Sequence, residues 1–157
     1  MRRFLIPLFV FLLVGACGFQ PVYAPSGSSA DRGNVAIDDI PGRSGHALRK
    51  ALMQQLAVGL PGLESSRLTV TLDESLRRLA LRPDLAASRT DIFVTGRYVL
   101  ATSDNAISGK ISAETSFNVP DAPYADIAAQ TDASQRAIDL LAQRIVSDIQ
   151  IQLSARE

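Results

Sequence analysis

Apolar residues recur at two different spacings along this chain, and the spacing separates the expected helices from the expected strands. Between residues 44 and 58 they recur at steps of three and four, which is typical of an amphipathic helix. Ser44 is a suitable N-cap, and Gly59 is a common residue at the end of a helix. The same spacing predicts a second helix over about 124–155, which is either continuous or begins near Asp132 as a cap.

Three further segments alternate apolar and polar residues with a period of two, as half-buried strands do. They cover about 67–81, 92–101 and 107–117, and short polar turns separate them, which predicts an antiparallel meander. A shorter strand is expected at 35–37. The order β-α-β-β-β-α predicts an α+β fold in which two helices pack on one face of a mostly antiparallel four-stranded sheet.

Two local details of this meander are less regular. The alternation weakens after Asp73, so a bulge near Glu74 is plausible. The turn after the first long strand is expected to run from Arg82 to Arg89. The segment 92–101 is partly apolar on both faces, which suits either a central strand under helices or a surface that contacts a partner.

The N-terminus has the pattern of a secretory signal. Two arginines precede an apolar run from Phe4 to Val14, and small residues then lead to Cys17. The run is too short to span a hydrocarbon core, which takes about 20 helical residues. We therefore expect a lipoprotein signal peptide at 1–16, a lipidated tether at 17–34 and the folded domain at 35–157.

Charge and composition argue against a nucleic-acid partner, a zinc site and nucleophilic catalysis. Sixteen basic residues balance 16 acidic ones, and loss of Arg2 and Arg3 with the signal would leave 14 against 16, or a net charge of −2. No basic field favours a nucleic-acid partner. Cys17 is the only cysteine and His46 the only histidine, so zinc sites and nucleophile–base pairs lack their usual residues. We expect no enzyme activity, no cofactor and no metal.

The run from Cys17 to Ala24, CGFQPVYA, resembles the mature start of the alphaproteobacterial LPS-assembly lipoproteins of the LptE (RlpB) family. The element order is similar across nearly the whole chain, as is the start of the first helix at Ser44, Leu48 and Arg49. The resemblance implies a lipoprotein anchored on the periplasmic side of the outer membrane. It would plug the translocon barrel LptD and assist its assembly and lipopolysaccharide insertion. The alternative is a periplasm-facing module that binds another amphiphile or peptidoglycan.

The resemblance also implies that basic residues of the sheet contact lipopolysaccharide, because some family members bind it that way. Guanidinium groups match phosphate oxygens in a bidentate geometry. The alternatives are solvated charges that protect strand edges, or ion pairs with the barrel. A surface position is expected for His46, and adjacent carboxylates such as Asp73 and Glu74 are expected on opposite faces of a strand. The candidate lipopolysaccharide-binding residues are Arg77, Arg78, Arg82, Arg89, Arg97 and Lys110.

Overall fold

The computed structural model describes residues 34–60, 63, 65–81 and 87–156. The predicted signal peptide and nearly all of the predicted tether lie outside these ranges, so the predicted domain boundaries remain predictions. The elements follow one another as β1 (Asn34–Ile37), α2 (Arg43–Gln55), a 3₁₀ turn (Leu56–Val58), β2 (Ser65–Leu81), β3 (Ala87–Thr102), β4 (Ala106–Asn118) and α3 (Pro123–Ser154). This confirms the predicted β-α-β-β-β-α order.

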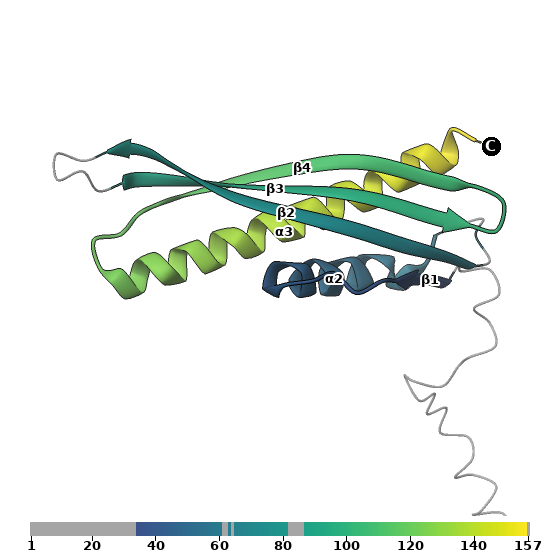
Figure 1. Cartoon of the computed structure of the whole chain (residues 1–157), viewed down its shortest axis with the longest axis horizontal. Coiled ribbons are helices and arrows are strands. Elements are labelled where there is room, and N and C mark those ends of the chain that lie inside the picture. The colour runs from purple at the N-terminus through teal and green to yellow at the C-terminus, as the bar shows by residue number, and fades with distance from the viewer. Residues whose placement is uncertain (1–33, 61–62, 64, 82–86, 157) are drawn as a thin grey trace, which may run out of the picture.

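The four strands form one mixed sheet in the order β1-β2-β3-β4. β1 pairs with β2 in parallel, whereas β2–β3 and β3–β4 are antiparallel. Figure 1 shows α2 and α3 on the same side of this sheet, as the sequence predicts. α2 lies toward β1 and β2, and α3 packs mainly on β3 and β4.

The core lies between this helical layer and one face of the sheet. Even-numbered residues of β3 face the helices, and a matching set on β2 and β4 completes the floor, because side chains alternate along a strand. Burying these aliphatic side chains supplies most of the driving force for folding. The fully buried large side chains are Leu48, Leu52, Leu60, Leu68, Ile92, Tyr98, Leu100, Ile107, Ile138, Leu141, Ile145 and Ile149.

Glycine, not serine, precedes the first turn of α2. Gly42 has φ 86°, a conformation that L side chains rarely adopt, and no side chain caps the helix. The predicted N-cap, Ser44, lies inside the helix, where its hydroxyl donates to Glu74 of β2. That prediction is wrong because the hydroxyl makes a tertiary hydrogen bond. The prediction for Gly59 is confirmed: it has φ 82° and donates its N–H to the Leu56 carbonyl at 2.8 Å.

Two details of the meander also differ from expectation. The β2–β3 register runs without interruption from Ser66↔Thr102 to Leu79↔Arg89, so no bulge occurs at Glu74. β3 begins at Ala87, which places Arg89 in the strand and not in the turn. Both long strands continue farther than their apolar alternation, because backbone pairing holds polar residues in strands as well.

α3 is one continuous helix from Pro123 to Ser154. Asp132 does not begin a shorter helix, since its carboxylate pairs with Arg136 one turn later. The Thr131 hydroxyl donates to the Ile127 carbonyl at 2.8 Å, within the same helix. No helix in the described ranges is both long enough and apolar enough to cross a membrane.

One polar cluster joins the two layers. The Tyr98 hydroxyl of β3 donates to the Asp148 carboxylate of α3, and the Gln152 amide donates to both, at 3.0 Å and 2.9 Å. Burial, followed by the bond to Asp148, raises the pKa of Tyr98 above its ordinary value of 10.0. Gly109 of β4 leaves room for this cluster, because a Cβ there would lie 2.6 Å from the Tyr98 ring.

Candidate functional site

The predicted cations fall mostly on the sheet face opposite the helices. Arg77, Arg89, Arg97 and Lys110 occupy alternate positions that share this open face, and all four are exposed. They form two groups. Arg77 and Arg89 lie toward the hairpin that joins β2 to β3, whereas Arg97 and Lys110 lie about 20 Å farther along the sheet, at ~3.3 Å per residue.

Both arginines of the hairpin group already contact other side chains, and Arg89 is also ion-paired. Arg77 lies over the Phe93 ring, with 5.1 Å from Cζ to the ring centroid. Arg89 Nε donates to the buried Asp91 carboxylate at 3.2 Å, and its Nη2 donates to the Ser116 hydroxyl at 2.9 Å. These contacts orient both guanidinium groups, and they leave Arg89 less free to bind an added phosphate.

The second group consists of two like charges side by side. Arg97 of β3 and Lys110 of β4 are direct Cα partners. Neither makes an ion pair within the described part of the chain. Directly opposed like charges destabilise a sheet, so an anion between them would relieve repulsion. This pair is the arrangement on the open face that best suits phosphate binding.

The remaining predicted residues do not join these groups. Arg78 follows Arg77 on β2 and therefore lies on the opposite, helix-bearing face, where it is exposed. Arg78 therefore does not share the open face with Arg77 and Arg89. Arg82 and Cys17 lie outside the described residues. His46 is exposed on α2, as expected.

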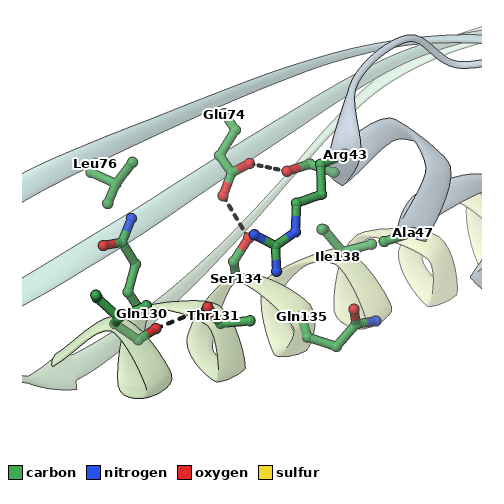
Figure 2. Close-up of a pocket in the computed structure, with 11 residues that line it drawn as sticks. Arg43, Ala47, Glu74, Leu76, Gln130, Thr131, Ser134, Gln135 and Ile138 are labelled. Atoms are coloured by element: carbon green, nitrogen blue, oxygen red, sulfur yellow. Dashed lines mark hydrogen bonds between the residues drawn. The ribbon is translucent and has the colours of Figure 1, made fainter. Parts of the chain in front are cut away.

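A pocket on the helix-bearing face was not predicted from the sequence. It has a volume of about 340 Å³ and lies between the start of α2, the middle of β2 and the N-terminal half of α3. Figure 2 shows Glu74 at its inner wall, with Leu76 beside it on the strand. The Glu74 carboxylate accepts hydrogen bonds from Ser44 of α2 and, at 2.6 Å, from Ser134 of α3.

The charged groups of this pocket remain unneutralised. Arg43 extends across the pocket near Glu74 in Figure 2, yet no ion pair links the two among the described residues. The rest of the wall alternates aliphatic groups with amides and hydroxyls, from Ala47, Leu76, Ile127, Gln130, Thr131, Gln135 and Ile138. Such a wall can bind a group that is apolar on one side and hydrogen-bonding on the other.

Adjacent carboxylates occur at Asp38–Asp39 and at Asp73–Glu74. Asp73 and Glu74 do lie on opposite faces of β2, as expected. Asp38 accepts from Thr69 and Arg67, both at 2.7 Å, and these hydrogen bonds lower the pKa of its carboxyl below 3.8. Within the described ranges, no group of three or more His, Cys, Asp or Glu residues is placed to hold a metal ion.

No protein-family model matches this sequence. No curated protein matches it either. Solved structures do share the fold. A candidate lipoprotein from Caulobacter crescentus CB15 aligns with a TM-score of 0.58 and 24% identity, over 76% of this chain and 90% of that one. Rare lipoprotein B from Shewanella oneidensis aligns with a TM-score of 0.59 and 12% identity, over 80% of this chain and 99% of that one. A minor lipoprotein from Acinetobacter baumannii aligns with a TM-score of 0.52 and 18% identity, over 78% of this chain and 92% of that one.

These likenesses establish the fold: this chain has the architecture of the rare lipoprotein B structure. The alignments cover nine-tenths or more of each of the three named structures, so the whole domain is shared and not one motif.

Proposed function

We propose that this chain is an outer-membrane lipoprotein, acylated at Cys17 and facing the periplasm. It serves as the plug or accessory subunit of the lipopolysaccharide translocon barrel LptD and assists barrel assembly and lipopolysaccharide insertion. The observation that carries this proposal is the domain-wide likeness to rare lipoprotein B, which covers 99% of that chain. The CGFQPVYA sequence at residues 17–24 supports the same role, because it adds a lipidation site to this fold.

The proposed role is non-enzymatic and needs no cofactor or metal. A subunit that fills or braces a barrel acts through its surface, so its function depends on a rigid core and on exposed contacts. The continuous α3 and the uninterrupted β2–β3 register support this reading, since they produce a long domain in which the described helices leave one sheet face uncovered. Two acyl chains would give stable anchoring where one is marginal.

Direct contact with lipopolysaccharide is part of the proposal only at the Arg97–Lys110 pair and at Arg77. Their charges are exposed and have no carboxylate partner among the described residues. Phosphate groups would bind there by charge-assisted hydrogen bonds. Arg89, which already bonds to Asp91, would contribute less.

Co-purification tests the central proposal. The full chain, expressed in its own Gram-negative host, is isolated from detergent-solubilised membranes and its partners are identified by mass spectrometry. We expect an outer-membrane β-barrel in stoichiometric amount, and an intact mass that begins at acylated Cys17. A preparation free of any barrel but carrying muropeptides or another amphiphile would instead support a binding module. A non-acylated N-terminus elsewhere would refute the anchor.

A further inference from the structure

Among the described residues, the helical layer does not extend over the hairpin end of β2. α2 begins at Arg43, beside Glu74, while β2 continues for seven more residues to Leu81. α3 does not fill this space, since it packs mainly on β3 and β4. Figure 1 shows β2 extending well past the start of α2, with α3 separating from the strands toward the same end. The pocket at Glu74 lies at the start of this uncovered region.

Both walls of this region expose apolar side chains. Leu76 shares the helix-bearing face of β2 with the core residues Leu68 and Val70, yet it is 49% exposed. On α3, no residue before Ala133 is buried, and Ile127 is 64% exposed. Helices in water gain most of their stability from a packed face. Roughly three turns of α3 therefore lack the packing that the rest of the helix has.

The chemistry of the walls favours a peptide over an acyl chain. Seven of the eleven lining side chains are hydrogen-bonding, and a hydrocarbon chain would leave them unsatisfied. Glu74 accepts from two hydroxyl groups and has no ion-pair partner in the described part of the chain, so it suits a Lys or Arg. The Arg43 guanidinium suits backbone carbonyls.

We propose that a segment of the barrel partner, with an aliphatic side chain next to a Lys or Arg, lies in line with α2 in the cleft formed by the Glu74 pocket and the uncovered region beyond it. This inference rests on the proposed function, because it takes the barrel as the partner. The aliphatic side chain would lie between Leu76 and Ile127, and the cation would pair with Glu74. The segment would complete the helical layer and pack the first turns of α3.

Photo-crosslinking tests the position of the contact. A benzophenone amino acid replaces Leu76 or Ile127 in the full chain within its host membrane, and Ile151 serves as the matched control. Ile151 is 62% exposed on the same helix, about 36 Å away at 1.5 Å per residue. We expect adducts from Leu76 and Ile127 to a barrel peptide that contains an aliphatic residue beside Lys or Arg.

Two pairs of variants test the energetics. Ile127→Glu should reduce barrel co-purification at least fivefold, whereas Ile151→Glu should leave it unchanged. Glu74→Gln should weaken the complex about tenfold, the loss of one charge-assisted bond. Its control, Asp73→Asn, removes an adjacent carboxylate from the opposite face and should have little effect. Circular dichroism and the melting temperature confirm that each variant folds.

The outcomes separate this inference from the proposed function. If the barrel co-purifies and crosslinks only from Ile151, the proposed function stands and the cleft inference is overturned. Adducts from the cleft to lipopolysaccharide or to a second copy of the chain also overturn it. If no barrel co-purifies with the unmodified chain, the proposed function itself fails, and the inference fails with it.

Discussion

The Tyr98 hydroxyl and the Asp148 carboxylate form a hydrogen bond that joins β3 to the C-terminal half of α3. These residues are 50 positions apart in the sequence. Tyr98 is almost fully buried, and Gln152 donates to both partners. A buried polar group is costly unless it is hydrogen-bonded, so this cluster allows only one alignment of the helix on the sheet.

Removing the Tyr98 hydroxyl should therefore destabilise the domain. We expect Tyr98→Phe to lower the free energy of unfolding by about 1–3 kcal/mol, because the Asp148 carboxylate loses one of its two donors and keeps only Gln152. Urea unfolding of the domain without residues 1–17 measures the change. The control is Tyr124→Phe at an 89% exposed position, where a change within about 0.5 kcal/mol is expected. Equal effects of the two variants would mean that the cluster does not stabilise the fold.

The same cluster predicts a pH dependence. The pKa of Tyr98 is raised above its ordinary 10.0 in the folded state, mainly by burial and then by Asp148. The unfolded chain therefore releases this proton first as the pH rises, and stability falls with increasing pH above about 10. Below that pH the contribution is fully present. Unfolding curves between pH 8 and 11 should show a decline in the parent domain that is shallower in Tyr98→Phe.

Gly109 should not tolerate a larger side chain. A Cβ at this position would lie 2.6 Å from Tyr98 Cε1 and 2.8 Å from Asp148 Oδ2. Gly109→Ala should cost about 1–3 kcal/mol, the range for overpacking. Ser108→Ala, at the exposed neighbouring position, is the control. A stable Gly109→Ala domain with an unchanged melting temperature would contradict the close approach of α3 to β4.

The apolar faces of α2 and α3 predict which substitutions destabilise the core. Leu52 of α2 and Ile145 of α3 are fully buried, as their spacing in the sequence predicts. Leu52→Ala and Ile145→Ala should each lower the free energy of unfolding by about 2–5 kcal/mol, because each leaves a cavity. Met53→Ala, next to Leu52 but half-exposed, is the matched control. Losses below about 0.5 kcal/mol at both core positions would contradict this packing.

The Arg97–Lys110 pair predicts salt-sensitive binding of lipopolysaccharide. Replacing both by Ala in the domain without residues 1–17 should weaken lipopolysaccharide pull-down at low salt, by up to about thirtyfold if each contributes ~0–1 kcal/mol. The difference should shrink at high salt, because screening removes exposed charge interactions. Arg89→Ala should matter less, since Asp91 already neutralises it. Unchanged binding by the double variant would assign these cations to another role.

The sequence alone determined the element order and the core faces. Period-two and period-3.6 patterns are local properties, so the strands, both helices and the burial of Leu52 and Ile145 were predictable from them. Gly59 was predictable for the same reason, because the helix end needs only nearby backbone groups. The open position of Arg97 and Lys110 followed from alternation once their strands were known.

Only the tertiary structure decided which distant residues meet. Ser44 is a residue type preferred as a helix N-cap, yet its hydroxyl donates a hydrogen bond to the Glu74 carboxylate, 30 residues away. Glu74 looked like one half of an acidic pair, and it is the point where α2, β2 and α3 converge. These outcomes depend on where the helices lie along strands that extend beyond them. Local periodicity carries no information about the position of a helix relative to a strand.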